Sequence, residues 1–196
     1  AITDSYFQDM DDMAGVALNS PNDTQLSGGR VASTITIEDQ RFNCAAIVIT
    51  VEPGPNSTVE VPQGVLTINF GTTGCTDLRG NIRTGKLIFT YNGRRFKPGS
   101  TVVTTTDNYT INGILIEGTR TLTNVTGSTQ EAPKFNAVLD NGKATFLADG
   151  TIAERESSIT WQWVRAANPT EDYLMIDQSS TANGITRGGR TYEVSL

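Results

Sequence analysis

The stretch from Phe70 to Thr123 constrains this chain more than any other feature. Polar and apolar residues alternate along it, and Gly and Asn residues interrupt the alternation at short intervals. Side chains of a strand point alternately to its two faces, so this period indicates half-buried strands. Asn-Gly between two such runs is the strongest short signal for a hairpin. The stretch therefore predicts consecutive antiparallel β-hairpins.

Turn signals of this kind occur within this stretch and also before and after it. They are Asn-Gly at 92–93, 112–113, 141–142 and 183–184, Asp149-Gly150, Gly80-Asn81 and Pro53-Gly54-Pro55. The predicted strands are 30–38, 43–52, 64–70, 82–91, 100–110, 113–124, 134–140, 143–149, 157–166, 172–181 and 185–195. We expect an all-β fold, an antiparallel hairpin meander forming a sandwich or curled sheet, with one short N-terminal α-helix.

That helix is predicted over residues 3–18, where apolar side chains recur with a helical period. An isolated helix of this length is marginal in water, so we expect it to pack against the sheet. The side chains expected at that contact are Phe7, Met10, Ala14 and Leu18. Residues 1–29 are interpreted as this helix and a polar linker, and residues 30–196 as a single antiparallel β domain.

Composition excludes several classes of function. The chain has no histidine, which removes the commonest general base and the commonest transition-metal ligand. Its net charge is −6, so it lacks the basic excess with which nucleic-acid-binding proteins grip phosphates. No apolar run approaches the roughly 18 residues of a membrane-spanning helix. We therefore expect no enzyme activity, no cofactor, no metal, no nucleic-acid partner and no transmembrane segment.

Two cysteines, Cys44 and Cys75, are present. They either form one disulfide or remain two free thiols, and neither belongs to a C-x-x-C redox motif. A Thr-rich, Lys-poor β protein favours the disulfide and an oxidising compartment. The bond would close a loop of about 32 residues and stabilise the fold by roughly 3–4 kcal/mol in the chain-entropy model.

Several segments resemble an uncharacterised family of secreted or lipoprotein-like β-rich cell-envelope proteins of Bacteroidota. The segments that carry the resemblance are Leu66–Thr76, Arg83–Thr90, Pro98–Gly118, Thr119–Asn124 and the stretch from Trp161 to the terminus. The Gly-Cys-Thr and Glu-Gly-Thr-Arg-Thr motifs are its most specific parts. The resemblance implies export to the extracellular space or cell surface and a β fold. It brings no known activity and no site residues.

Two tryptophans are the strongest candidates for a binding site. Trp161 and Trp163 lie two residues apart in a predicted strand, so they share one face, and Arg165 extends that face. Exposed, the pair would form a stacking platform for sugar rings. Buried, it would anchor the core, because aromatic side chains bury the largest apolar area. We interpret the pair as core and keep the platform as the alternative.

Charged clusters have weaker interpretations. Asp9, Asp11 and Asp12 are assigned to a solvated helix face, since calcium loops need alternate oxygen ligands and a Gly turn. A carboxylate pair for glycoside hydrolysis could come from Asp149, Glu117, Glu154 and Glu156, but strand-surface charges are the preferred interpretation. Glu117 is expected to pair with Arg120. The basic cluster of Arg94, Arg95 and Lys97 is assigned to a solvated hairpin tip.

These observations favour a non-enzymatic extracellular or cell-envelope protein, structural or adhesive, with self-assembly as one form of that role. The alternative is a carbohydrate-binding module or envelope accessory protein that uses Trp161 and Trp163. The expected partners are accordingly a second copy, through strand-mediated assembly, or a surface glycan. For residues 185–196 we expect a hairpin with 172–181 through Asn183-Gly184, in preference to exchange of this strand between chains.

Overall fold

The protein is described by a computed structural model that covers residues 2–28, 31–125, 127 and 132–195. Two helices, α1 (Ile2–Asn19) and α2 (Asp23–Ser27), precede the strands in the chain. Two short 3-10 helices, η1 (Gln40–Phe42) and η2 (Pro169–Glu171), lie in connections between strands. The strands are β1 (Ser33–Ile35), β2 (Val48–Pro53), β3 (Gln63–Asn69), β4 (Cys75–Thr76), β5 (Ile82–Asn92), β6 (Thr101–Ile111), β7 (Ile114–Asn124), β8 (Lys134–Phe146), β9 (Thr151–Val164), β10 (Tyr173–Ile176), β11 (Thr181–Ile185) and β12 (Thr191–Ser195).

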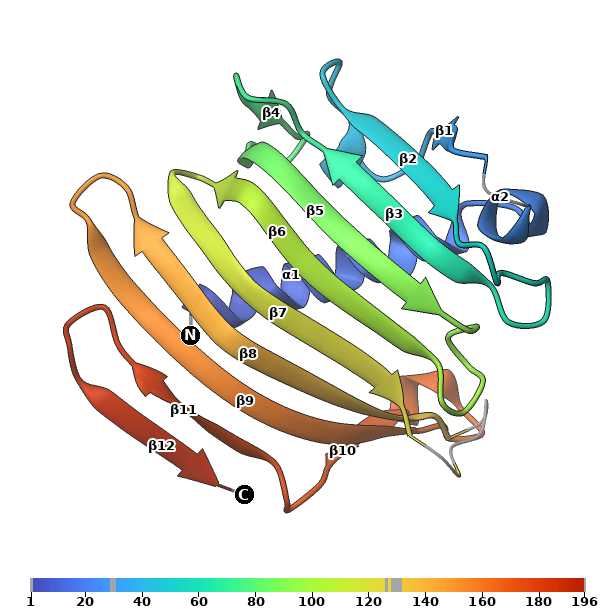
Figure 1. The fold of residues 1–196 in the computed structure, drawn as a ribbon. Coiled ribbons are helices and arrows are strands. Elements are labelled where there is room, and N and C mark those ends of the chain that lie inside the picture. The colour runs from blue at the N-terminus through green and yellow to red at the C-terminus, as the bar shows by residue number, and fades with distance from the viewer. Residues whose placement is uncertain (1, 29–30, 126, 128–131, 196) are drawn as a thin grey trace.

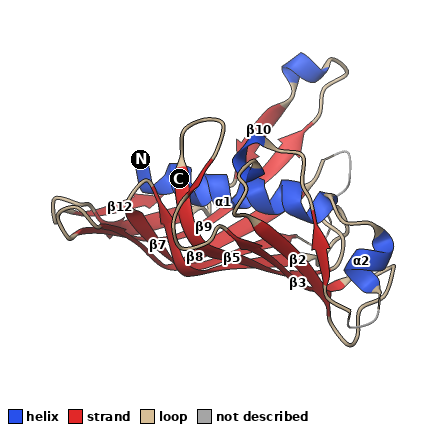
Figure 2. Ribbon diagram, turned by 90° about the horizontal axis from the view of Figure 1, so that it is seen from above, coloured by secondary structure: helices blue, strands red, loops and turns tan. Residues whose placement is uncertain are grey.

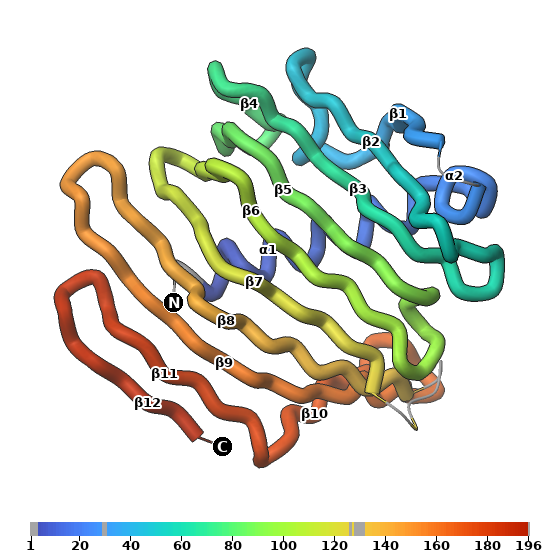
Figure 3. Tube along the Cα trace, viewed as in Figure 1, coloured from blue at the N-terminus to red at the C-terminus, as the bar shows by residue number. Residues whose placement is uncertain are grey.

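All described strands belong to one antiparallel sheet (Figure 1). Its order is β1-β2-β3-β5-β6-β7-β8-β9-β11-β12, while β4 pairs with β5 and β10 pairs with β9. Apart from β4 and β10, which branch off this path, strands that are neighbours in space follow one another in sequence, which confirms the predicted meander. The sheet does not close, and β1 and β12 form its two ends (Figure 3). Of the two predicted arrangements, the curled single sheet is the one adopted.

A row of β-bulges bends the central strands. The register shifts at Gly85 of β5, at Gly118 of β7 and at Asn141 of β8. All three residues have positive φ, and a Cβ at Gly85 would lie 2.2 Å from the carbonyl oxygen of Asn108. Bulges bend a strand and increase its twist, so a row of them curls the whole sheet.

Helix α1 takes the place of a second sheet. It lies across one face of the sheet (Figure 2) and shares a single hydrophobic core with it. The helix side chains buried in that core are Phe7, Met10, Met13, Ala14 and Ala17. The strands contribute, among others, Leu66, Ile68, Leu87, Phe89 and Ile116. Of the four predicted contacts, Phe7, Met10 and Ala14 are buried and Leu18 is partly buried.

Two of the predicted hairpin turns are wrong. Asn141-Gly142 is a bulge inside the continuous strand β8, not a turn between two strands. Asn183-Gly184 lies within β11, and the chain reverses instead at 186–190. The C-terminal strand is therefore paired within its own chain, but with β11 rather than with residues 172–181. The segment predicted as a linker also contains α2.

The disulfide between Cys44 and Cys75 is present, with the two Cα atoms 5.7 Å apart. Cys44 lies in the loop between η1 and β2, and Cys75 begins β4. The bond therefore joins the loop before β2 to the short strand at the start of the β5 hairpin. The prediction is confirmed.

Candidate binding surface

The C-terminal half of β9 extends past the end of β11 and pairs there with β10. We call this two-stranded extension, with the loop and η2 that join its strands, the arm (residues 161–176). It stands out from the sheet on the side that carries α1 (Figure 2). The arm contains all the residues of the sequence-predicted platform.

One face of the arm carries four apolar side chains. Trp163 pairs in register with Leu174, and Trp161 with Ile176, so the four share a face. Trp163 is 46% exposed, and Leu174 and Ile176 are both more than half exposed. Trp161 is half-buried and packs against Phe135 of β8, with ring centroids 6.0 Å apart. The patch thus starts at the edge of the core and runs out into solvent.

The assignment of both tryptophans to the core is wrong for Trp163. Its indole Nε1 donates to Asp172 Oδ2 at 3.1 Å, which fixes the ring in its exposed position. Arg165 is also exposed, but it follows the last residue of β9 and lies in the loop of the arm. The structure therefore brings Trp161 and Trp163 onto one surface and leaves Arg165 outside the paired strands.

Strand β10 is exposed on both faces. Tyr173 and Met175, on the face opposite Trp163, are 54% and 51% exposed. Within the described residues β10 pairs with β9 and with no second strand. An exposed edge strand presents unpaired N–H and C=O groups, and natural proteins usually protect such an edge with charges or with a covering segment. Here the four residues of the edge strand are apolar, which is typical of an interaction surface.

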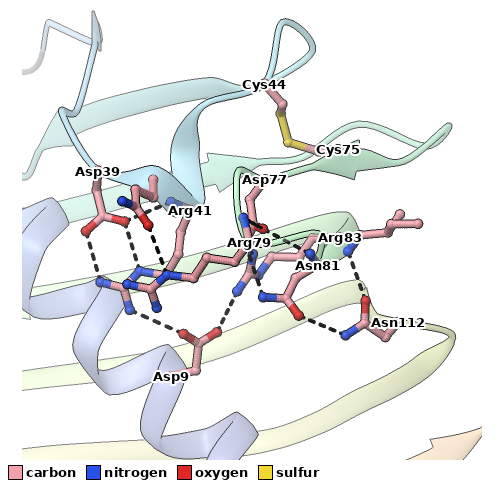
Figure 4. A network of polar contacts seen from close by, with 12 residues as sticks. Asp9, Asp39, Arg41, Cys44, Cys75, Asp77, Arg79, Asn81, Arg83 and Asn112 are labelled. Carbon is pink, nitrogen blue, oxygen red and sulfur yellow. Dashed lines mark hydrogen bonds and ion pairs between the residues drawn. A yellow bond between two sulfur atoms is a disulfide. The ribbon is translucent and has the colours of Figure 1, made fainter.

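A second feature, a polar cluster that the sequence did not reveal, lies between α1 and the sheet (Figure 4). Arg83 of β5 is 1% exposed. Its guanidinium donates to Asp77 at 2.5 Å, to Asp9 of α1 at 2.9 Å and to the Tyr109 hydroxyl at 3.3 Å. Asp9 also accepts from Arg41, at 3.2 Å. The buried charge of Arg83 is thus fully engaged, as a buried ion must be to be tolerated.

The pKa values in this cluster follow from those contacts. Burial alone would raise the pKa of Asp77, but hydrogen bonds from Arg83 and from the backbone N–H groups of Asn81 and Arg79 hold it below its usual value. Burial likewise opposes the charge of Arg83, yet the surrounding anionic and hydroxyl oxygens raise its pKa above the usual value. Asp77 and Arg83 therefore stay charged throughout the physiological range.

Two further ion pairs join α1 to the sheet. Arg120 of β7 donates twice to Asp11, at 3.1 and 2.9 Å, and Arg155 of β9 pairs with Asp4 at 2.6 Å. The interpretation of Asp9 and Asp11 as a solvated face is therefore wrong, because both face the sheet. The expected partnership of Glu117 with Arg120 is also wrong, since Arg120 is directed at the helix.

Each of the four carboxylates considered for glycoside hydrolysis has a neighbouring hydrogen-bond donor or cation. Glu156 accepts the bulge N–H of Asn141 at 2.7 Å. Glu117 and Glu154 both flank Lys143 in the strand register. Hydrogen bonds from Thr151, together with Arg187, lower the pKa of Asp149 to about 2. In the described part of the chain no group of three or more His, Cys, Asp or Glu residues is placed to hold a metal ion.

No family model, no curated protein and no solved structure matches this chain. Among the described helices none is both long and apolar enough to cross a membrane. The disulfide indicates an oxidising environment of the extracellular type. Fold and surface together define an all-β protein with one curled sheet, a helix joined to one face of that sheet by ion pairs, and a projecting apolar arm.

Proposed function

We propose that this is a non-enzymatic protein of the extracellular space or cell envelope, with a structural or adhesive role, that self-associates through the arm. One observation carries the proposal: β10 is an apolar strand exposed on both faces, and no described strand pairs with its outer edge. Addition of a strand to such an edge gains main-chain hydrogen bonds as well as apolar contacts. Secretion is part of the proposal, and the disulfide supports it.

A second copy fits this edge in a specific register. In an antiparallel contact about a two-fold axis perpendicular to the strands, one residue must lie opposite its own copy. If that residue is Met175, Leu174 of each chain lies opposite Ile176 of the other. The apolar faces that contain Trp161 and Trp163 then join into one surface. This register places no carboxylate opposite another carboxylate, whereas centring on Leu174 would place Ile176 opposite Asp172.

The proposal is tested by the mass of the protein in solution over a range of concentrations. We expect a concentration-dependent dimer that Ile176→Lys abolishes, because a charge would be forced into an apolar contact. Leu147→Lys is the matched control: Leu147 is also 55% exposed but lies in the β8–β9 turn. A wild-type protein that stays monomeric at high concentration, or equal loss in both variants, would rule out self-association through β10.

A second candidate, glycan binding, is favoured by the exposure of Trp163 and by the hydrogen bond that orients its ring. Exposed indole rings stack on the apolar faces of sugars. Titration of tryptophan fluorescence with soluble oligosaccharides tests it. We expect a saturable change that Trp163→Ala removes; a response that survives this substitution would exclude the platform.

A further inference from the structure

A cavity of about 120 Å³ lies between the C-terminal half of α1, α2 and strands β5 to β7. Its apolar lining comes from Ala14, Leu18, Leu26, Tyr91, Val102 and Leu122. An apolar cavity of about 150 Å³ engineered in another protein stays dry and binds benzene. The space here is therefore of the size that takes one aromatic ring or a short alkyl group.

Arg95, an exposed residue, is among those that line this cavity. Its guanidinium carbon lies 5.8 Å from the ring centroids of both Phe96 and Phe135, which hold the guanidinium by cation–π contact. It also crosses α1 at Gly15, where a Cβ would come within 2.7 Å of Nη1. Within the described residues no carboxylate forms an ion pair with Arg95.

The other charges around the cavity are already paired. Arg120 donates two hydrogen bonds to Asp11, and Arg94 pairs with Asp23 of α2 at 2.9 Å. Burial raises the pKa of Asp11, against the opposing effects of Arg120 and Arg95, and the two hydrogen bonds from Arg120 offset the charge of this carboxylate. Among the described residues Arg95 thus forms no ion pair at this cavity, and its charge acts on the neighbouring carboxylate of Asp11 through space.

We propose that this cavity binds a small monocarboxylate with an apolar body, an aryl or short acyl carboxylate. The apolar body fills the space between α1 and the sheet, and the carboxylate meets the guanidinium of Arg95. A guanidinium matches a carboxylate with two parallel N–H donors, which makes the contact selective for this anion. No residue of the arm lines the cavity, and the proposal does not rest on self-association.

Calorimetric titration with benzoate, and with benzyl alcohol as its uncharged counterpart, tests the proposal. We expect benzoate to bind, and Arg95→Gln to weaken benzoate about tenfold while leaving benzyl alcohol within about twofold. Arg190→Gln, which alters an arginine in the β11–β12 turn, should change neither. Leu122→Phe should abolish both, because the larger ring occupies the cavity.

Three results would overturn the proposal. No heat with benzoate at about 10 mM would show that the cavity takes no such ligand. Equal loss of benzoate in Arg95→Gln and Arg190→Gln would show that Arg95 is not the anion contact. Undiminished binding to Leu122→Phe, with thermal unfolding as evidence that the variant is folded, would place the ligand elsewhere.

Discussion

Arg83 shows how single residues hold this fold together. Its guanidinium is buried between the helix and the sheet and contacts Asp9, Asp77 and Tyr109. A buried ion pair contributes little against an apolar replacement, but removal of one partner is costly, because a charge is left without compensation. Of the carboxylates of Asp9 and Asp77, that of Asp77 is the more buried, with no exposed side-chain surface.

Asp77→Asn should lower the free energy of unfolding by about 3 kcal/mol at neutral pH, because Arg83 loses a buried anionic partner. The pKa of Asp77 is lowered in the folded protein, so its contribution is complete above the ordinary pKa of an aspartate and is lost as the pH falls through the lowered value. The difference between variant and wild type should therefore shrink in acid.

Urea denaturation between neutral pH and strongly acidic pH measures this difference. Asp12→Asn, at an exposed position of α1, is the control and should be nearly neutral. A difference from wild type that stays constant through the acid range would show that the charge of Asp77 is not what stabilises the fold.

The sequence predicted the disulfide but not this ion cluster, and the reason is physical. Two cysteines allow a single intramolecular pairing, so composition and compartment were sufficient. Arg83, Arg120 and Arg155 look like ordinary surface charges within their strands. The sequence did contain a signal for this cluster. The helical and strand periods define which side chains share a face, and acidic residues on the apolar face of α1 need cations opposite them. Strand order was needed to use it.

Among the elements, α1 covers the apolar face of the sheet that a second sheet would cover in a sandwich. Phe7, 2% exposed, is central to its apolar face. Phe7→Ala should destabilise the protein by about 3 kcal/mol or more, through lost burial and the cavity left behind. Gln8→Ala, at an exposed position one residue along, should change the stability little.

Thermal and urea unfolding of both variants test the role of α1. A Phe7→Ala effect below about 0.5 kcal/mol would mean that the helix contributes nothing to the core and that the sheet is stable without it.

One cause of misassignment is that Gly serves close packing as well as turns. Gly184 was interpreted as part of a turn, but a Cβ there would meet the hydroxyl of Tyr192 at 2.8 Å. Gly64 of β3 meets the hydroxyl of Tyr91 in the same way, at 2.6 Å. A cross-strand tyrosine that covers a strand glycine offsets the cost of that glycine, which in a single sequence resembles a hairpin signal.

At the scale of the whole molecule, the meander was predictable because its contacts join consecutive strands. The choice between one curled sheet and a two-sheet sandwich was not predictable. It depends on the β-bulges of the central strands and on the packing of α1 against the sheet. The exposed arm was also missed. Apolar residues such as Leu174 and Ile176 suggest a core until the structure shows that β10 pairs at one edge alone within the described residues.

Self-association through β10 is the central claim, and a cysteine at its proposed axis tests it most directly. Both native cysteines are engaged in the disulfide, so Met175→Cys would carry the single free thiol of the chain. Directly opposed residues of an antiparallel pair have Cα atoms about 4.5–5.5 Å apart, within the range of a disulfide. Leu174→Cys, the matched control, would be offset from its own copy by two residues and lie beyond about 7 Å.

The measurement is non-reducing electrophoresis after mild oxidation of the two variants at equal concentration. The proposed contact predicts a covalent dimer for Met175→Cys that reductant reverses, and a monomer for Leu174→Cys. A monomer in both variants, or the same amount of dimer in both, would contradict the proposed contact.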